Sequence, residues 1–233
     1  MTLGETFRQI PLIFTFSLLL LMPVGADTAK GTIVTCENNL GSSIENFCQV
    51  TPKVLWRGAK PDKDGAAWLV EQGVRTIVNL ESLHDDRDAF TQARLANNGS
   101  YEVDYFRVRD WEPLPAIAPE LSDDHVAHFL AIMNQAPKPV YVHCRSGENR
   151  TGVMVAAYRV IVEGADDDAA IEKAINEMEG YQGFWFKTDA NYIRGLTPER
   201  REAIRRKAKQ WILNLKQDAR FICEAGKCRM HEQ

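Results

Sequence analysis

The sequence predicts an α/β fold in which a mostly parallel central sheet is flanked by helices. The first observation is that short segments rich in β-branched residues alternate with longer segments of helical periodicity between residues 54 and 215. The second is that residues 139–143 form a short apolar strand, soon followed by a segment over 151–162 that is apolar almost all round, as in a buried helix. Strands that alternate with helices in this way indicate parallel pairing. The composition, 45% hydrophobic and 26% charged, is that of an ordinary globular protein.

The N-terminus has the pattern of an export signal. An apolar run over residues 10–22 follows Arg8, Pro23 ends it, and residues 24–26 (VGA) offer the small side chains that an export peptidase reads. We therefore expect a signal peptide over residues 1–26, cleaved after Ala26, and no stable membrane insertion after cleavage. The alternative is an uncleaved membrane anchor, for which the apolar run is short.

Five cysteines, in a chain expected to reach an oxidising compartment, predict two disulfides and one free thiol. The free thiol is expected to be Cys144, because its neighbours belong to a different and more informative pattern. The other four, Cys36, Cys48, Cys223 and Cys228, allow three pairings, and the sequence does not choose among them. The pairing Cys36–Cys48 with Cys223–Cys228 closes the smallest loops and is the one that we favour.

Behind the signal we expect a polar lead-in over residues 27–52, one domain over 53–217 and a C-terminal tail with two cysteines over 218–233. The first half of the domain is expected to supply three strands and two helices. The strands are predicted over residues 54–56, 75–80 and 101–108, and the helices over 62–72, ended by Gly73, and 87–96. Residues 109–117, which contain a tryptophan and prolines, are expected to form a loop.

The second half of the domain is expected to be mainly helical. A helix over 119–133 precedes the strand 139–143, and three more helices follow, over 151–162, around 171–178 with Asp166 as its cap, and from Thr197 onward. Apolar residues mark the buried faces of the first, third and last of these helices: Val126, Phe129, Leu130, Met133, Ile171, Ala174, Ile175, Met178, Ile204, Ala208, Trp211, Ile212 and Leu215. Basic residues on the last helix are interpreted as a solvated face: Arg200, Arg201, Arg205, Arg206 and Lys209.

The most informative stretch is residues 143–152, HCRSGENRTG, which joins the strand 139–143 to the buried helix. In α/β sheets, ligands bind where the carboxyl end of a strand leads through a loop into a helix. Successive backbone N–H groups of such a loop, together with the first N–H groups of the helix, can bind a tetrahedral oxyanion. The loop residues expected to bind it are Arg145, Ser146, Gly147, Glu148 and Asn149.

Three side chains of this stretch are expected to carry the chemistry. Cys144 is the candidate nucleophile, because the positive field of the loop and the helix end stabilises its thiolate. Arg150 can grip two oxygens of a bound phosphate with its planar guanidinium. Attack on phosphorus gives a phosphocysteine, which water then hydrolyses. The Thr151 hydroxyl is expected to donate to the Cys144 sulfur and ease this second step, with capping of the helix as the alternative.

The reaction also needs a carboxylic acid that protonates the leaving oxygen and then takes a proton from water. Asp110, in the loop after the strand 101–108, is the candidate. Asp104, inside that strand, and Glu112, in the same loop, are its competitors. His143 is expected to orient the loop by hydrogen bonding rather than to act as a base.

Charge and chemistry limit the classes of partner. The formal net charge of -4 gives no reason to expect nucleic-acid binding. No cofactor and no metal are expected, because the loop and Arg150 already supply the charge stabilisation that a metal would give. The expected partner is a phosphorylated protein or a small phosphate ester, and the oligomeric state stays open.

The run HCRSGENRTG resembles the phosphate loop of the protein tyrosine phosphatase superfamily, HCxxGxxR(S/T)G. Together with VLWRGAKP at 54–61, RTIVNLES at 75–82 and AAYRVIVEG at 156–164, it most resembles the atypical dual-specificity branch, and in particular bacterial periplasmic phosphatases linked to biofilm control. The resemblance covers most of residues 54–195. It implies a dual-specificity phosphatase-like fold, a periplasmic location, Cys144 as nucleophile, Arg150 as phosphate-binding arginine and Asp110 as general acid. The loop after Arg109 reads Asp-Trp-Glu-Pro, whereas conventional tyrosine phosphatases read Trp-Pro-Asp.

Two enzymatic functions and one binding function compete. The leading one is hydrolysis of phosphotyrosine, with phosphoserine and phosphothreonine as further substrates, on envelope proteins. The second is hydrolysis of inositol phosphates or another small polyanion, for which several cations must surround the site: Arg145, Arg107, Arg109, Arg57 and Lys187 are the candidates. The third is a non-catalytic phosphate-binding module, against which the intact set of Cys144, Arg150 and Asp110 argues.

Overall fold

The computed structural model of this chain describes residues 40, 42–165, 167–178 and 185–231, all within the unit Ile33–Gln233. The expected signal peptide, Cys36 and Asp166 lie outside the described residues. Among the described residues, no helix has both the length and the apolar character needed to cross a bilayer.

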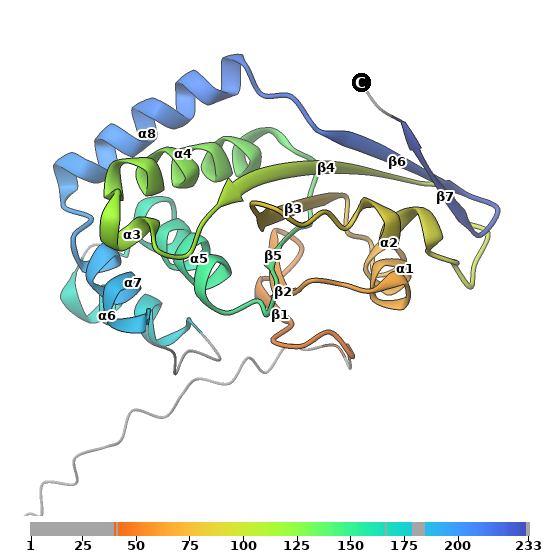
Figure 1. The fold of residues 1–233 in the computed structure, drawn as a ribbon, viewed down its shortest axis with the longest axis horizontal. Coiled ribbons are helices and arrows are strands. Elements are labelled where there is room, and N and C mark those ends of the chain that lie inside the picture. Colours follow the sequence, from red (N-terminus) through yellow and green to blue (C-terminus); the bar gives the residue numbers. More distant parts are fainter. Residues whose placement is uncertain (1–39, 41, 166, 179–184, 232–233) are drawn as a thin grey trace, which may run out of the picture. The chain divides into compact units, whose positions relative to one another are not determined.

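The described strands form one sheet in the order β1-β2-β5-β3-β4-β6-β7 (Figure 1). Its central strands β2, β5, β3 and β4 are parallel, whereas β1, β6 and β7 pair antiparallel at the two edges. The bounds are β1 (Cys48–Thr51), β2 (Leu55–Ala59), β3 (Thr76–Glu81), β4 (Tyr101–Asp110), β5 (Val140–Cys144), β6 (Ala219–Glu224) and β7 (Lys227–His231).

Helices cover both faces of the sheet (Figure 1). One face packs against α1 and α2, and the other against the longer helices that include α4 and α5. The bounds are α1 (Lys63–Glu71), α2 (Arg87–Gln92), α3 (Leu114–Ile117), α4 (Pro119–Gln135), α5 (Asn149–Ile161), α6 (Asp168–Asn176), α7 (Phe186–Arg194) and α8 (Pro198–Leu213).

The alternation of side chains along β5 decides what surrounds its last residue. Val140, Val142 and Cys144 belong to the core cluster that also contains the buried faces of α4 and α5. Tyr141 belongs to the cluster on the opposite face. Because successive side chains of a strand point to opposite faces, His143 points away from α5, and Cys144 points toward it.

The structure confirms the α/β fold with a parallel centre, but the whole sheet is mixed. The antiparallel edge strands lie in segments that we expected to be a lead-in and a tail, where polar residues and cysteines hide the alternation of a strand. Helices α3 and α7 were also missed, and α2 ends at Gln92 rather than near residue 96. At the start of α6, Asp167 accepts a hydrogen bond from the Ala170 N–H (2.7 Å) and caps the helix.

The interpretation of the basic residues on α8 as a solvated face is wrong for Arg201. Arg201 is buried, and its Nε donates to the Leu196 carbonyl (2.6 Å). Arg205 donates to the Ile161 carbonyl at the end of α5 (3.2 and 2.7 Å), which satisfies a helix C-terminal acceptor. These contacts attach α8 to its neighbours, because long arginine side chains can reach backbone carbonyls.

The disulfide Cys223–Cys228 is present and joins β6 to β7. Cys48 is also disulfide-bonded, while its favoured partner, Cys36, lies outside the described residues. Cys144 is the free and buried cysteine of the described part of the chain. The prediction of a disulfide within the C-terminal tail is therefore confirmed.

Candidate active site

The loop after β5 is held from outside by hydrogen bonds to three of its consecutive carbonyl groups, those of residues 145–147. The Lys60 backbone N–H binds the first (3.2 Å), the Asn46 side-chain amide binds the second (2.9 Å), and the Arg57 guanidinium binds the third. Carbonyls that point outward turn the N–H groups of the loop toward its inside. The N–H groups of residues 145–148 donate to no other described residue, so they remain available to an anion.

Gly147 lets this loop lie directly against β2. Its φ is +76°, in the left-handed region that favours glycine. A Cβ atom at this position would lie 2.3 Å from the backbone carbonyl carbon of Gly58. Glycine is therefore required here both by backbone conformation and by the close approach of β2.

The expected nucleophile and phosphate-binding residues lie around this ring of N–H groups. Cys144 ends β5, is 1% exposed and is followed at once by the loop. Arg150 stands in the first turn of α5, where its Nη2 lies 3.3 Å from Glu112 Oε1. Thr151 is buried next to it, and its hydroxyl makes no hydrogen bond within the described part of the chain, so the expected contact with the Cys144 sulfur stays a prediction.

Next to Cys144, a buried polar network holds His143. Its Nε2 lies 2.8 Å from Asp86 Oδ2, and both side chains are fully buried. Its Nδ1 lies 3.3 Å from the Cys144 carbonyl. The other Asp86 oxygen accepts hydrogen bonds from Asn79 Nδ2 (2.6 Å) and from the Tyr105 hydroxyl. These contacts join His143 to the backbone at the start of the loop, and its role in orienting the loop stays a prediction.

The network keeps Asp86 ionised despite its burial. Burial is the largest effect and by itself raises the pKa of this carboxyl group, but the His143 charge and hydrogen bonds from His143, Tyr105 and Asn79 together lower the pKa of Asp86 to about 2. Burial and the Asp86 charge raise the pKa of Tyr105, so its hydroxyl stays a donor. An ionised Asp86 requires a hydrogen on His143 Nε2, which fixes the orientation of the ring.

The register of the sheet separates Asp110 from its competitor Asp104. Asp110 ends β4 opposite Glu81 at the carboxyl edge of the parallel strands, two strand positions from β5, or about 10 Å at the backbone. Asp104 is paired with Thr76, which is paired with Val140, four residues before Cys144. This places Asp104 about 13 Å toward the opposite edge of the sheet, so its position argues against a role in proton transfer.

Asp110 and Glu112 make different contacts. Asp110 is 4% exposed, and its Oδ1 lies 2.8 Å from His125 Nδ1 and accepts the Trp111 backbone N–H (2.9 Å). Glu112 is partly exposed and contacts Arg150. Glu112 therefore stays a competitor for the role of general acid, because its carboxylate contacts Arg150, the arginine that we expect to bind phosphate.

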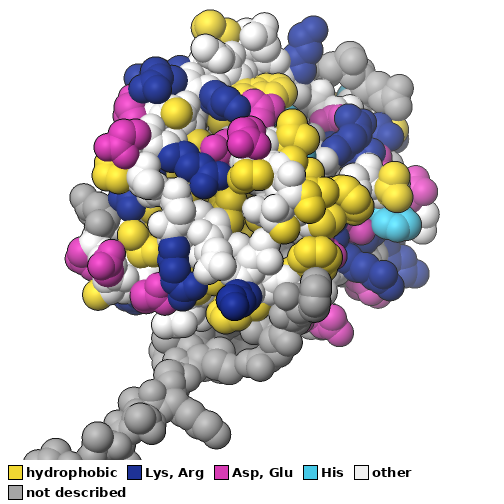
Figure 2. Space-filling view, turned by 60° about the vertical axis from the view of Figure 1, so that its left-hand side comes forward, with side chains coloured by type: hydrophobic (Ala, Val, Ile, Leu, Met, Phe, Trp, Pro, Cys, Tyr) yellow, Lys and Arg dark blue, Asp and Glu magenta, His cyan; other side chains and the backbone are white. Residues whose placement is uncertain are grey.

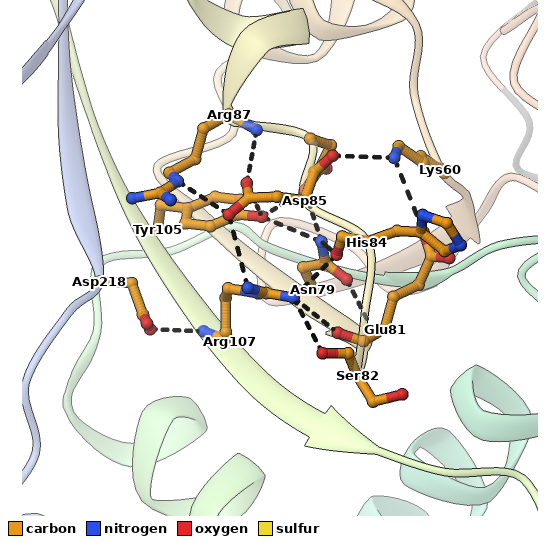
Figure 3. Close-up of polar contacts among 11 residues, drawn as sticks. Lys60, Asn79, Glu81, Ser82, His84, Asp85, Arg87, Tyr105, Arg107 and Asp218 are labelled. Atoms are coloured by element: carbon orange, nitrogen blue, oxygen red, sulfur yellow. Dashed lines mark hydrogen bonds and ion pairs between the residues drawn. The ribbon is translucent and has the colours of Figure 1, made fainter.

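The structure does not bring together all the cations that a small polyanion would need. Arg107 donates to the carbonyls of Glu81 (3.0 Å) and His84 (2.9 Å) and lies 3.5 Å from Asp85, so it holds the loop between β3 and α2 (Figure 3). Arg57 is buried beneath the loop after β5. The exposed members of the set are Arg145, Arg109 and Lys187.

Several residues that support the site from a distance were not predicted. We assigned no role to Asp86, Asn46 or His125, and we named Arg57 only as a candidate cation for a small polyanion. Arg57 binds two backbone carbonyls, those of Gly147 and of Glu177 (3.2 Å). No local pattern marks these residues, because each reaches the site through a contact between distant segments.

Among the described residues no metal cluster stands out, and the face shown in Figure 2 has no large patch of a single charge sign. No group of three or more His, Cys, Asp or Glu side chains is placed there to hold a metal ion. Acidic and basic side chains are interspersed on the face that Figure 2 shows. This pattern agrees with the modest net charge of the chain.

Comparison with known proteins gives a family match over most of the chain. A family model described as "DSP-PTPase phosphatase fused to NAD+ Kinase" matches residues 31–191. The dual specificity protein phosphatase TpbA of Pseudomonas aeruginosa is 33% identical over 156 residues, which cover 64% of this chain and 62% of TpbA. The probable chloroplastic NAD kinase 2 of Oryza sativa is 30% identical over 125 residues, which cover 52% of this chain and 12% of the rice protein.

The matches to curated relatives are thus partial, since this chain spans less than two thirds of the length of either protein. A crystal structure of P. aeruginosa TpbA also matches, with 26% identity and a TM-score of 0.49, over 72% of this chain and 92% of that chain.

Proposed function

Since this chain belongs to the DSP-PTPase phosphatases of the protein tyrosine phosphatase superfamily, we propose that it is a cysteine-dependent phosphomonoester hydrolase that acts on phosphotyrosine proteins. The observation that carries the proposal is the loop of residues 145–148 directly after Cys144, whose carbonyl groups at 145–147 are bound from outside while its N–H groups donate to no described residue. A phosphoryl group bound by these N–H groups and by Arg150 is held for in-line attack by the Cys144 thiolate.

The reaction then proceeds in two steps. In the first, Cys144 Sγ bonds to phosphorus while the bond to the leaving oxygen breaks, and Asp110 gives that oxygen a proton. In the second, water attacks phosphorus, the bond to sulfur breaks, and Asp110 takes a proton from the water. The Thr151 hydroxyl donates to the departing thiolate, and Arg150 with the loop N–H groups holds the phosphoryl oxygens throughout.

Burial of the nucleophile supports phosphotyrosine as the preferred substrate. Because Cys144 is 1% exposed, the phosphoryl group must be carried into the fold on a long side chain. Phosphotyrosine is longer than phosphoserine or phosphothreonine, which we propose as slower substrates. TpbA carrying a cysteine-to-serine change was crystallised with phosphotyrosine.

The experiment is phosphate release by residues 27–233 in the presence of EDTA. A phosphotyrosine peptide, a phosphoserine peptide and an inositol polyphosphate are compared side by side, with C144S as the control. We expect the phosphotyrosine peptide to be hydrolysed fastest, and C144S to release no phosphate. Preference for the inositol polyphosphate would assign the enzyme to small polyanions. A C144S variant that binds phosphotyrosine, together with an inactive wild type, would indicate a binding module.

We also propose that the enzyme works outside the cytoplasm, in the periplasm. The apolar run over residues 10–22 and the disulfide Cys223–Cys228 support this location, because disulfides persist in oxidising compartments. Cell fractionation of the full chain and of a variant without residues 1–26 tests it. Equal amounts of both in the soluble cytoplasmic fraction would contradict the proposal.

A further inference from the structure

The two oxygens of the Asp110 carboxyl group have different surroundings. Oδ1 accepts the Trp111 backbone N–H (2.9 Å) and lies 2.8 Å from His125 Nδ1. Oδ2 accepts no hydrogen bond from any described residue. The carboxyl side chain is 6% exposed, so these contacts are shielded from competition by bulk water.

His125 reaches Asp110 because of its place on α4. The buried face of this helix includes Ser122, Val126 and Phe129, and His125 lies at its margin, one turn from Ser122 and from Phe129. Its side chain is 24% exposed. The contact joins residues 15 apart in the chain, so it closes the segment that holds Trp111, Glu112 and α3. The backbone N–H of Trp111 and the ring of His125 thus approach the same oxygen from two different segments.

A general acid must hold its proton on the oxygen that faces the leaving group. When His125 Nδ1 carries a hydrogen, Oδ1 accepts two N–H donors and has no free lone pair for a proton, which leaves Oδ2 to carry the proton of Asp110. We propose that His125 is a positioning residue for Asp110, an inference that rests on the proposed function. The Nδ1–H of His125 holds Oδ1 as an acceptor, so that Oδ2 carries the proton in each step.

This hydrogen bond serves both steps without a change of tautomer. In the first step, the Oδ2–H bond breaks as the leaving oxygen takes the proton, and Oδ1 stays an acceptor. In the second, the attacking water gives its proton to Oδ2, and Oδ1 again stays an acceptor. His125 itself neither gains nor loses a proton, and its effect on the rate passes entirely through Asp110.

The experiment exploits the dependence of general acid catalysis on the leaving group. Aryl phosphates range from p-nitrophenyl phosphate, whose phenolate leaves readily without a proton, to phenyl phosphate, whose phenol is about as weakly acidic as tyrosine. kcat/KM is measured across this series for the wild type, D110N, H125F, H125N and the double variant D110N/H125F. Asparagine at 125 places an N–H near the position of Nδ1, whereas phenylalanine keeps the ring but has no donor. H128N, three residues later on α4, is the matched control.

We expect D110N to lose about 10²-fold to 10³-fold on phenyl phosphate and far less on p-nitrophenyl phosphate. H125F should show the same trend with a loss of about tenfold on phenyl phosphate, and H125N and H128N should stay within about threefold of the wild type. The double variant should match D110N, because His125 acts through Asp110.

Each contrary result overturns a different step. A loss in H125F that is equal for all leaving groups, or that adds to the loss in D110N, would show a purely structural role for His125. If H125N lost as much kcat/KM on phenyl phosphate as H125F, the missing Nδ1–H could not be the cause of the loss. If the loss of kcat/KM depended on the leaving group in E112Q and not in D110N, Glu112 would be the general acid. The proposed role of His125 would then have no basis. Absence of phosphate release by the wild type would instead contradict the proposed function itself.

Discussion

At the scale of single residues, Arg150 is in contact with a carboxylate while it is expected to bind a phosphate. Its Nη2 lies 3.3 Å from Glu112 Oε1, and the Glu112 side chain is 39% exposed. A substrate phosphate must therefore compete with Glu112 for the same guanidinium. We predict that E112Q binds substrate more tightly, because it removes a negative charge beside the phosphate site.

The expected change is modest, because a partly exposed ion pair contributes about 0.2–1 kcal/mol, or up to about fivefold in affinity. KM for phenyl phosphate and the inhibition constant of inorganic phosphate should both fall by about two- to fivefold, with kcat within about twofold of the wild type. Steady-state kinetics measure both quantities. A large loss of kcat on phenyl phosphate would identify Glu112 as the general acid.

Arg57 shapes the same loop from below. It is 1% exposed and donates to the Gly147 and Glu177 carbonyls, so its loss would leave buried acceptors without a donor. We predict that R57M lowers the free energy of unfolding by about 1–3 kcal/mol. We also predict that it lowers kcat/KM by at least about 10²-fold, because misplacing the loop N–H groups removes their contacts with the phosphoryl oxygens.

Urea unfolding and kcat/KM on p-nitrophenyl phosphate measure the two effects of R57M. The matched control is R75M, since Arg75 lies over the Tyr101 ring at the far edge of the sheet. R57M with kcat/KM within about threefold of the wild type would show that the loop keeps its shape without this arginine.

The residues that we expect to carry the chemistry could be named from the sequence because they are contiguous. Cys144, Arg150 and Thr151 stand in one run whose spacing is fixed by a strand, a loop and a helix turn. The supporting residues could not, since Asp86 reaches His143 across 57 positions of chain and Asn46 reaches Ser146 across 100. Such pairings depend on the order of the strands in the sheet, which no local pattern contains.

At the scale of elements, α4 and α8 share an interface that contains a titratable side chain, His128. The His128 ring of α4 stacks on Trp211 of α8, with centroids 4.1 Å apart and planes 9° from parallel. Burial is the largest effect on the pKa of His128 and lowers it from 6.5 to about 4; Asp218 and Asp124 act to raise it, and His125 acts to lower it. The folded protein therefore takes up this proton only at a lower pH than the unfolded chain.

The sign of the effect on stability follows from this depressed pKa. Between pH 6.5 and about 4 the unfolded chain binds a proton that the folded protein does not, so this contribution to stability is present above pH 6.5 and is lost as the pH falls. The loss is about 3 kcal/mol at most. We predict that H128F, which keeps a ring for the stack but does not titrate, loses less stability than the wild type on acidification from about pH 7 to about pH 4.

Urea unfolding at the two pH values measures the difference between the wild type and H128F. Acidification also protonates carboxylates, but both proteins share that contribution, so the difference isolates His128. Equal losses in the two proteins would contradict a depressed pKa at this position. If H128F loses the contact between α4 and α8, its urea midpoint will already be lower than that of the wild type at neutral pH. An effect of packing can therefore be told apart from an effect of titration.

The elements with a clear period were predicted, and the short or polar ones were missed. α4 has a buried face long enough to show helical periodicity, α5 is apolar almost all round over its length, and β3 has a continuous run of buried residues. α3 spans only Leu114–Ile117, and β7 is exposed at three of its five positions, so neither shows a recognisable pattern. Their structure depends on what they pack against rather than on their own composition.

At the scale of the whole sheet, the candidate site lies on the central parallel strands, and antiparallel strands extend the sheet at both edges. Within the described residues, β2, β5, β3 and β4 bring Ala59, Cys144, Glu81 and Asp110 to one edge, as parallel strands must. β6 pairs with β4 only over Tyr101–Tyr105, which is the half of β4 remote from Asp110. The hairpin of β6 and β7 therefore supports the sheet from the end opposite the chemistry.

Because the hairpin lies far from Asp110, we expect it to contribute to stability and not to catalysis. Removal of the disulfide Cys223–Cys228 tests this expectation. The bridge closes a loop of sequence separation 5, for which the loss of chain entropy in the unfolded state gives about 2 kcal/mol. We predict that C223S/C228S lowers the free energy of unfolding by about this amount and leaves kcat/KM on phenyl phosphate within about twofold of the wild type. Both are measured on the same preparation, by urea unfolding and by steady-state kinetics. A loss of kcat/KM above about tenfold at unchanged stability would mean that the hairpin shapes the active-site end of β4, because strand displacement would then pass along β4 to Asp110.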